Sequence, residues 1–255
     1  MDPFILDDHD RWPLGSFPGL AAVPSVVHAV TTRNGPEFGT DATSNQTLQA
    51  VQEVTSALDL AGAAWARQVH GGSVLRVRTP GLAGEADGLV TDVPGLAVLG
   101  RSADCPLVIM AGLRDDHSPA VGLAHASWRS TVRGITASVM ARLCDELGVV
   151  PGTVRAGIAP SAGPCCYEVG NEVRDEALER LGNGAARWFF QVGERWHFDL
   201  WSANLAQLTA AGVPASQVWG SGTCTICQGE QFWSWRGQGK SAGRFAAMIG
   251  VFRNH

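Results

Sequence analysis

The sequence predicts an α/β fold in which helices pack outside a sheet. Short apolar segments typical of strands alternate with segments whose apolar residues recur every three or four positions, as on one face of a helix. The chain has 255 residues, of which 45% are hydrophobic, so it can bury a substantial core. No repeat, low-complexity tract or clear linker divides it, and we therefore expect one domain over residues 1–255.

The expected elements follow an irregular, proline-rich lead at 1–27. Strands are expected at 25–30, 63–69, 73–79, 95–99, 106–110, 120–126, 153–160, 216–224, 231–237 and 243–253. Helices are expected at 46–59, 132–147, 171–182 and 200–212. Ser44 and Asp199 are suited to cap the first and the last of these helices, and Gly212 is suited to end the last one.

Composition excludes several classes of protein. The net charge is −5 and no run of five basic residues occurs, which argues against nucleic acid as a partner. No apolar stretch approaches the length of a membrane span, and the first residues lack the order of a signal peptide. Six cysteines are too sparse for a disulfide scaffold. We expect a cytoplasmic protein without a membrane partner.

Three polar residues each follow an apolar strand-like segment and stand beside small residues: His70, Cys105 and His125. Two imidazoles and a thiolate suit Zn²⁺, and three protein ligands leave a fourth position for water or substrate. Asp104 would then orient a ligand imidazole or handle a proton. The spacing does not force these residues together. Structural histidines with an inert thiol, or a Cys–His nucleophile pair oriented by Asp104, remain alternatives.

Arginines near these segments are candidates for binding phosphate, because the planar guanidinium holds two oxygens at once. Arg33 lies in a polar loop, and Arg129 lies just after His125 at an expected helix start, where anions are favoured. We favour these two over Arg101. A surface or capping role is the alternative for each.

Four further cysteines are Cys224 and Cys227, in a C-x-x-C pattern, and the adjacent Cys165 and Cys166. A four-thiolate zinc site normally uses two separated pairs, so this pattern is a poor match. We favour buried or loop thiols, with a redox pair as the alternative.

Eight sequence blocks, found from about residue 28 to the C-terminus, resemble one family in order and approximate spacing. That family was once named multicopper polyphenol oxidase (laccase), and its members are also called purine nucleoside phosphorylases or peptidoglycan editing factor. The blocks are TTRNG, RQVHGGSV, ADGLVTDVPGLAV, RSADC, GLAHASWRS, IAPSAGPCCYEVG, DLWSANLAQL and CTICQGEQFWSWR. The resemblance implies that His70, Cys105 and His125 bind zinc at the active site, with Cys105, Asp104 and His125 as catalytic residues.

The resemblance also implies a fold and an activity. The fold is the three-layer α-β-α architecture of the cysteine-hydrolase type, with a mixed sheet. The activity is phosphorolysis of adenosine, inosine, guanosine or methylthioadenosine, with adenosine deamination as a side activity. The expected partners are a purine nucleoside and phosphate, the expected cofactor is Zn²⁺ with Cu²⁺ as the alternative, and the expected state is a monomer. Asn45 is interpreted as the remnant of a substrate-binding asparagine of the family.

Three other functions stay open: a hydrolase that edits a muramoyl–serine linkage in a peptidoglycan precursor, a copper-dependent phenol oxidase, and a binding module with a closed pocket. The oxidase is disfavoured, because seven histidines without a His-x-His pair cannot supply a laccase copper cluster. Two departures bear on the pocket. Ser127 and Ser130 stand where the family usually has glycine, which predicts a narrower pocket, and the loop at 34–46 is aberrant.

Overall fold

Two mixed β-sheets stacked face to face form the centre of the computed structural model, which describes residues 4–8 and 11–252. The first sheet contains, in spatial order, β1 (Ile5–Asp8), β2 (Pro13–Ser16), β3 (Val26–Thr31), β16 (Phe245–Val251), β8 (Leu96–Ser102), β4 (Gly62–Arg67) and β6 (Gly81–Glu85). The second contains β15 (Val218–Gly220), β11 (Arg155–Ile158), β9 (Leu107–Leu113), β10 (Pro119–His125), β7 (Gly88–Thr91) and β5 (Val74–Arg76).

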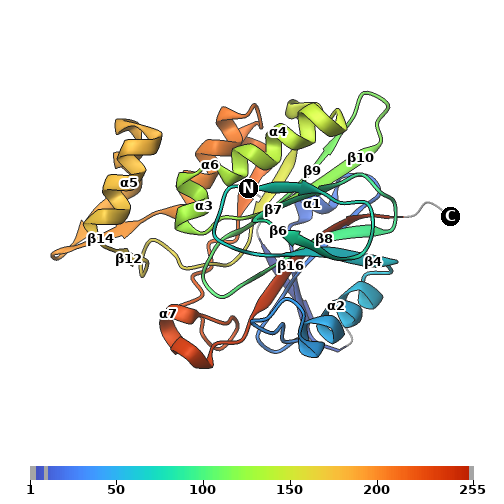
Figure 1. Ribbon diagram of the computed structural model, residues 1–255, viewed down its shortest axis with the longest axis horizontal. Coiled ribbons are helices and arrows are strands. Elements are labelled where there is room, and N and C mark those ends of the chain that lie inside the picture. The colour runs from blue at the N-terminus through green and yellow to red at the C-terminus, as the bar shows by residue number, and fades with distance from the viewer. Residues whose placement is uncertain (1–3, 9–10, 253–255) are drawn as a thin grey trace.

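Helices cover the outer face of each sheet (Figure 1). The second sheet packs against α4 (Ile135–Leu147) and α6 (Leu200–Ala210). The first sheet packs against α2 (Asn45–Ala57). The mixed α/β class is thus confirmed, but the order of layers is helix, sheet, sheet, helix.

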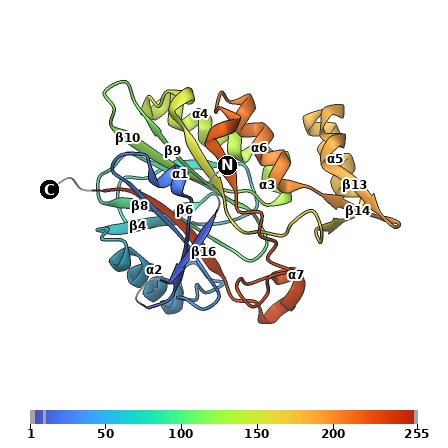
Figure 2. The same cartoon turned by 180° about the vertical axis from the view of Figure 1, so that it is seen from behind.

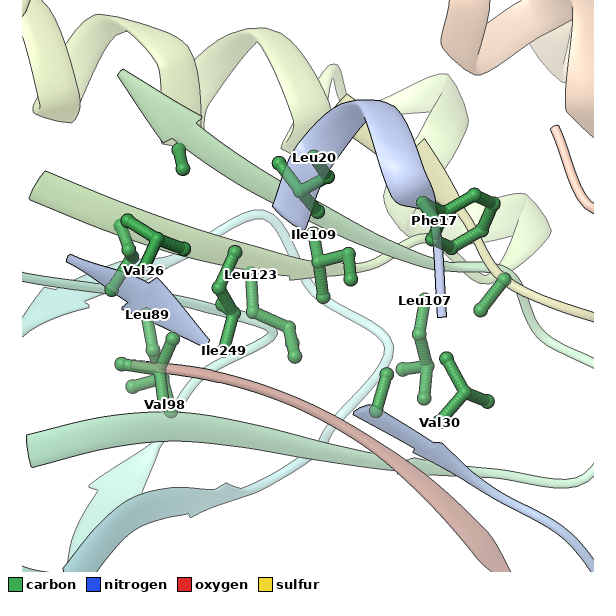
Figure 3. Packing of buried hydrophobic residues seen from close by; sticks show 14 of the residues in the cluster. Phe17, Leu20, Val26, Val30, Leu89, Val98, Leu107, Ile109, Leu123 and Ile249 are labelled. Carbon is green, nitrogen blue, oxygen red and sulfur yellow. The ribbon is translucent and has the colours of Figure 1, made fainter. Parts of the chain in front are cut away.

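The apolar core between the sheets explains this difference from the single sheet that we expected. Val98 and Ile249 from the first sheet pack with Leu107, Ile109 and Leu123 from the second (Figure 3). Strands buried on both faces read as continuous apolar runs. Such a run does not reveal whether a helix or a second sheet covers each face.

Local sequence signals place the helices well. Ser44 caps α2 by accepting a hydrogen bond from the Thr47 N–H, and Asp199 caps α6 by accepting one from the Ser202 N–H. The helix expected at 132–147 is α4, which begins at Ile135. A separate short helix, α3 (Trp128–Val132), precedes it, because Gly134 between them adopts a left-handed conformation with φ of 76°.

Two expectations are corrected, and one sheet was not predicted. The lead at 1–27 is not irregular, because its described residues include β1, β2 and α1 (Pro18–Ala21); residues 1–3 and 9–10 lie outside the described residues. The expected strand at 231–237 is a turn followed by α7 (Trp235–Gln238), which Ser234 caps through the Gly237 N–H. A third sheet of β12 (Glu168–Val169), β14 (Arg195–Phe198) and β13 (Phe189–Val192) was not predicted. With α5 (Asn171–Leu181) it projects from one end of the molecule (Figure 2).

Strand register brings the end of β10 to two other segments. His125, the last residue of β10, pairs with Leu107 at the start of β9, two positions after Cys105. On the other side, Ala124 pairs with Gly88 of β7, which places Asp87 beside His125. None of the helices in residues 4–8 and 11–252 is long and apolar enough to cross a membrane.

Candidate active site

The structure brings His70, Cys105 and His125 together at one end of the two sheets. His70 lies in the loop after β4, Cys105 in the connection between β8 and β9, and His125 at the end of β10. Their donor atoms all lie within 4.8 Å of one another, and the two imidazole rings meet edge to face with centroids 5.1 Å apart. His125 is buried, whereas His70 is exposed. Segments far apart in the sequence therefore form one cluster.

Asp87, which the sequence analysis missed, organises this cluster. Its Oδ1 lies 2.8 Å from Nδ1 of His125 and also accepts a hydrogen bond from the backbone N–H of His70 at 3.0 Å. Its Oδ2 accepts bonds from the N–H groups of Val69 and Gly71. A carboxylate with these donors is ionised, so Nδ1 of His125 donates to it and Nε2 is the nitrogen that remains for the cluster. The signal available in the sequence was an aspartate directly before an apolar, strand-like segment.

Asp104 lines the same region but makes other contacts. Its carboxylate accepts hydrogen bonds from Oγ1 of Thr225 at 2.7 Å and from the backbone N–H of Arg236 at 2.6 Å. Its φ of 105° is uncommon for a non-glycine residue, and these bonds hold it there together with one from the Ala162 N–H to its carbonyl oxygen. The orienting role that we had considered for Asp104 is therefore filled by Asp87. A proton-handling role for Asp104 stays a prediction.

Charge within the cluster favours an ionised thiol. Burial alone would raise the pKa of the Cys105 thiol, but the charge of His125 and hydrogen bonds from both histidines outweigh it and lower that pKa to about 6. For His125, burial alone would lower the pKa, but Cys105 and Asp87 raise it to about 9. A thiolate is the form of cysteine that binds metal and acts as a nucleophile.

A cavity of about 510 Å³ opens onto the cluster. This is within the usual size range of small-molecule sites. Its other lining residues are Thr40, Gln68, Arg101, Ser102, Ala103, Asp104, Ser127, Trp128, Arg129, Tyr167, Leu200, Trp235, Arg236 and Arg244.

Two predicted substrate residues do not line this cavity. Arg33 donates to the carbonyl oxygen of Gly229 and lies over the ring of Trp233, 4.5 Å from its centroid. Asn45 is the exposed first residue of α2. Arg33 was assigned from its place in a polar loop and Asn45 from the family resemblance, and neither specifies the direction in which a loop carries its side chains.

Four arginines surround the cavity instead: Arg101, Arg129, Arg236 and Arg244. Among the described ion pairs, which cover residues 4–8 and 11–252, none joins one of these four to a carboxylate. Arg101 is buried, and burial, followed by the charge of Arg244, lowers its pKa to about 10, so it is still charged at neutral pH. Guanidinium groups that line a cavity and have no carboxylate partner favour an anionic ligand.

The cavity also has aromatic walls. Trp128 and Trp235 each carry a guanidinium over the ring, from Arg129 and Arg244 respectively. Tyr167, the only tyrosine of the chain, lines the cavity too, and burial raises its pKa, so its hydroxyl keeps the proton.

The two serines at the start of α3 have different positions. Ser127 lines the cavity and accepts a hydrogen bond from the Ser130 N–H, which caps the helix. Ser130 is fully buried, and its Oγ lies 2.8 Å from Oγ of Ser127. Only Ser127 can narrow the cavity directly.

The donor set fits a divalent metal ion. Two imidazoles and a thiol with a lowered pKa are ligands of zinc, and the adjoining cavity leaves room for a fourth ligand. Asp87 supplies the carboxylate contact that metal-binding histidines usually make through their second nitrogen.

Fold and donor set together define an α/β protein with a candidate metal centre where its strands end. The chain belongs to the family described as "Multi-copper polyphenol oxidoreductase laccase", whose sequence profile matches residues 37–252. A protein of Deinococcus radiodurans named "Purine nucleoside phosphorylase" is 34% identical over 253 residues, which cover 94% of each chain. "Adenosine deaminase RL5", from an unknown prokaryotic organism, is 33% identical over 170 residues, which cover 66% of this chain and 62% of that protein.

A solved structure has the same fold. The crystal structure of the Bacillus licheniformis hypothetical protein YfiH superposes with a TM-score of 0.84 at 27% identity and covers 98% of this chain and 100% of that one. The mixed sheets and flanking helices described above are therefore the fold of this relative.

Proposed function

We propose that the protein is a purine nucleoside phosphorylase that holds zinc at His70, Cys105 and His125. The observation that carries the proposal is the adjacency of this donor cluster to a cavity lined by four arginines without carboxylate partners. The name of the Deinococcus radiodurans relative supports it.

The arginines supply the phosphate site. Phosphorolysis forms a bond between a phosphate oxygen and C1′ of the ribose and breaks the bond from C1′ to the purine nitrogen. Arg101 and Arg244 are partly desolvated like charges, and an anion between them relieves their repulsion. Arg129 is more exposed and adds a guanidinium near His125. These groups bind phosphate and orient one of its oxygens for attack.

The aromatic side chains supply the purine site. Trp128 and Trp235 line the same cavity, and we assign their rings to stack with the purine. Tyr167 keeps its proton and can donate a hydrogen bond to a purine nitrogen as the glycosidic bond breaks. The leaving purine needs such a donor, because negative charge develops on it.

The cluster acts at the reacting end of the substrate. Zinc, when bound, supplies a Lewis acid that stabilises negative charge on oxygen. Asp87 holds His125 in the tautomer that can bind it. Asp104 lines the same cavity and accepts hydrogen bonds from Thr225 and Arg236, and we assign it to accept a proton there.

Adenosine deamination is a second candidate for the same site. The relative named "Adenosine deaminase RL5" favours it. In that reaction water adds to the purine ring and ammonia leaves, so the arginine-bound phosphate has no part in it. Phosphate dependence therefore distinguishes the two reactions.

The test is a product assay with phosphate present or withheld. Adenosine, inosine, guanosine and methylthioadenosine are each incubated with the purified protein, and products are separated by chromatography. We expect free base and ribose 1-phosphate, or methylthioribose 1-phosphate, only when phosphate is present. Conversion of adenosine to inosine at the same rate without phosphate would support the deaminase. No turnover of any nucleoside by zinc-loaded protein would overturn both.

A further inference from the structure

A second cluster of metal-binding groups lies apart from the three ligands of the candidate active site. Cys165, Cys166, Cys224 and Cys227 bring their four sulfur atoms within 4.8 Å of one another. The first two come from the loop before β12, and the other two come from the loop after β15. The pairs are separated by about sixty residues of sequence, with contacts at separations of 61 and 62.

The sulfur positions match those of a tetrahedral site. With zinc–sulfur bonds of about 2.3 Å, the sulfurs of a tetrahedral tetrathiolate lie about 3.8 Å apart. Sγ of Cys227 lies 3.7 Å from that of Cys165 and 3.4 Å from that of Cys166. A single disulfide would use only two of the four sulfurs, whereas a tetrahedral zinc site uses all of them.

A backbone donor beside Cys224 suits a thiolate. The Gly163 N–H donates to Sγ of Cys224 at 3.2 Å. Hydrogen bonds to the charged form stabilise that form. Cys224 is buried, whereas Cys165 and Cys227 are exposed at a hollow of about 360 Å³, so an ion can reach the cluster from solvent.

We propose that these four cysteines form a structural zinc site. Binding of Zn²⁺ to four thiols releases four protons and leaves a site with four protein ligands and no open position, which is the arrangement of structural and not catalytic zinc. The sequence-based preference for unligated thiols is replaced by this assignment, because the fold closes the adjacent pair onto the C-x-x-C pair.

The four-cysteine site lies on two loops that also carry or contact residues of the active-site cavity. Between its ligands lies Thr225, which bonds to the Asp104 carboxylate and donates its backbone N–H to Ser161. Directly after Cys166 lies Tyr167, a wall of the active-site cavity. Zinc at the four sulfurs clamps these two loops together, so that Tyr167 and Asp104 are held at fixed positions in the cavity.

The test counts zinc in a background that lacks the other cluster. In Cys105→Ala, we expect one zinc per chain by mass spectrometry of the metal, and X-ray absorption should show four sulfur neighbours at about 2.3 Å. Cys227→Ser in that background should lose this zinc. Cys144→Ser is the matched control and should retain it, because Cys144 belongs to neither cluster.

Two results would overturn the proposal. One is a Cys105→Ala protein that binds no zinc after loading with ZnCl₂ under reducing conditions. The other is a thiol count of the denatured, unreduced wild-type protein that gives fewer than six free thiols, with a mass two daltons lower for each disulfide formed. The absorption measurement needs no change in the cluster, so misfolding of a serine variant does not affect it. Activity is not used, and failure of the phosphorylase proposal leaves the result unchanged.

Discussion

Asp87 and His125 form a buried carboxylate–imidazole pair, with Oδ1 and Nδ1 2.8 Å apart, at the point where β7 and β10 lie side by side. The same carboxylate accepts three backbone N–H groups from the loop that carries His70. One side chain thus positions two of the three candidate ligands.

Replacement of this carboxylate tests its role directly. Asp87→Asn should weaken zinc binding at the active-site cluster about 10- to 100-fold, because the histidine loses the partner that fixes its tautomer. Zinc affinity is measured by competition with a chromophoric chelator, in a Cys227→Ser background so that only this cluster is titrated. Asp92→Asn is the control, since Asp92 follows the same strand but pairs with Arg76 and Arg114. Equal zinc affinities for the two variants would show that Asp87 does not support zinc binding.

Phosphate affinity should depend on an arginine that lines the cavity and not on Arg33. Arg244→Gln should raise the KM for phosphate about tenfold or more, because a charge-assisted hydrogen bond is worth about 1.5–3 kcal/mol. Arg33→Gln should leave that KM within about twofold, since Arg33 bonds to Gly229 outside the cavity. Initial rates at saturating nucleoside give both values. A large effect of Arg33→Gln alone would restore the sequence-based assignment.

Replacement of the two serines, Ser127 before α3 and Ser130 within it, should affect the free energy of unfolding more than substrate binding. Ser127→Ala should lower the free energy of unfolding by about 1 kcal/mol through loss of the helix cap. Ser130→Ala should lower it by a similar amount, about 1 kcal/mol for one buried hydrogen bond, without changing KM, because Ser130 does not reach the cavity. Urea unfolding and nucleoside kinetics measure the two effects. A clear shift of KM in Ser130→Ala would contradict this placement.

Stability should fall in mild acid because of His28. This buried side chain accepts the Phe17 N–H at Nε2 over 2.8 Å, and burial lowers its pKa from 6.5 to about 4. The unfolded chain takes up the proton near pH 6.5 and the folded chain resists it down to about 4. The contribution of neutral His28 to the free energy of unfolding is therefore fully present above pH 6.5 and is lost as pH falls to 4. At 1.36 kcal/mol per pKa unit, it amounts to about 3 kcal/mol.

His28→Gln is the comparison for this effect, because glutamine offers an acceptor but does not titrate. Urea unfolding of both proteins at pH 7.5 and pH 4.5 should show a smaller acid loss in the variant. The same loss in both would assign the effect to other groups.

Helices and their caps were predictable because their signals are local. Ser44 and Asp199 each bond to an N–H three residues later, so the evidence lies within one turn of sequence. The prediction of a strand at 231–237 was wrong because two local signals conflict there. The aromatic residues favour a strand, but Ser234 caps a short helix.

The sequence by itself determined the α/β class, most helix limits and the identity of His70, Cys105 and His125 as residues at the ends of apolar segments. Only the tertiary structure decided that two sheets are stacked, that Asp87 and not Asp104 contacts His125, that Arg244 and not Arg33 lines the cavity, and that four cysteines meet. The reason is physical. Residue type and spacing along the chain determine local conformation, whereas the partner of a strand, a carboxylate or a thiol comes from a distant segment, and its place depends on how the whole core packs.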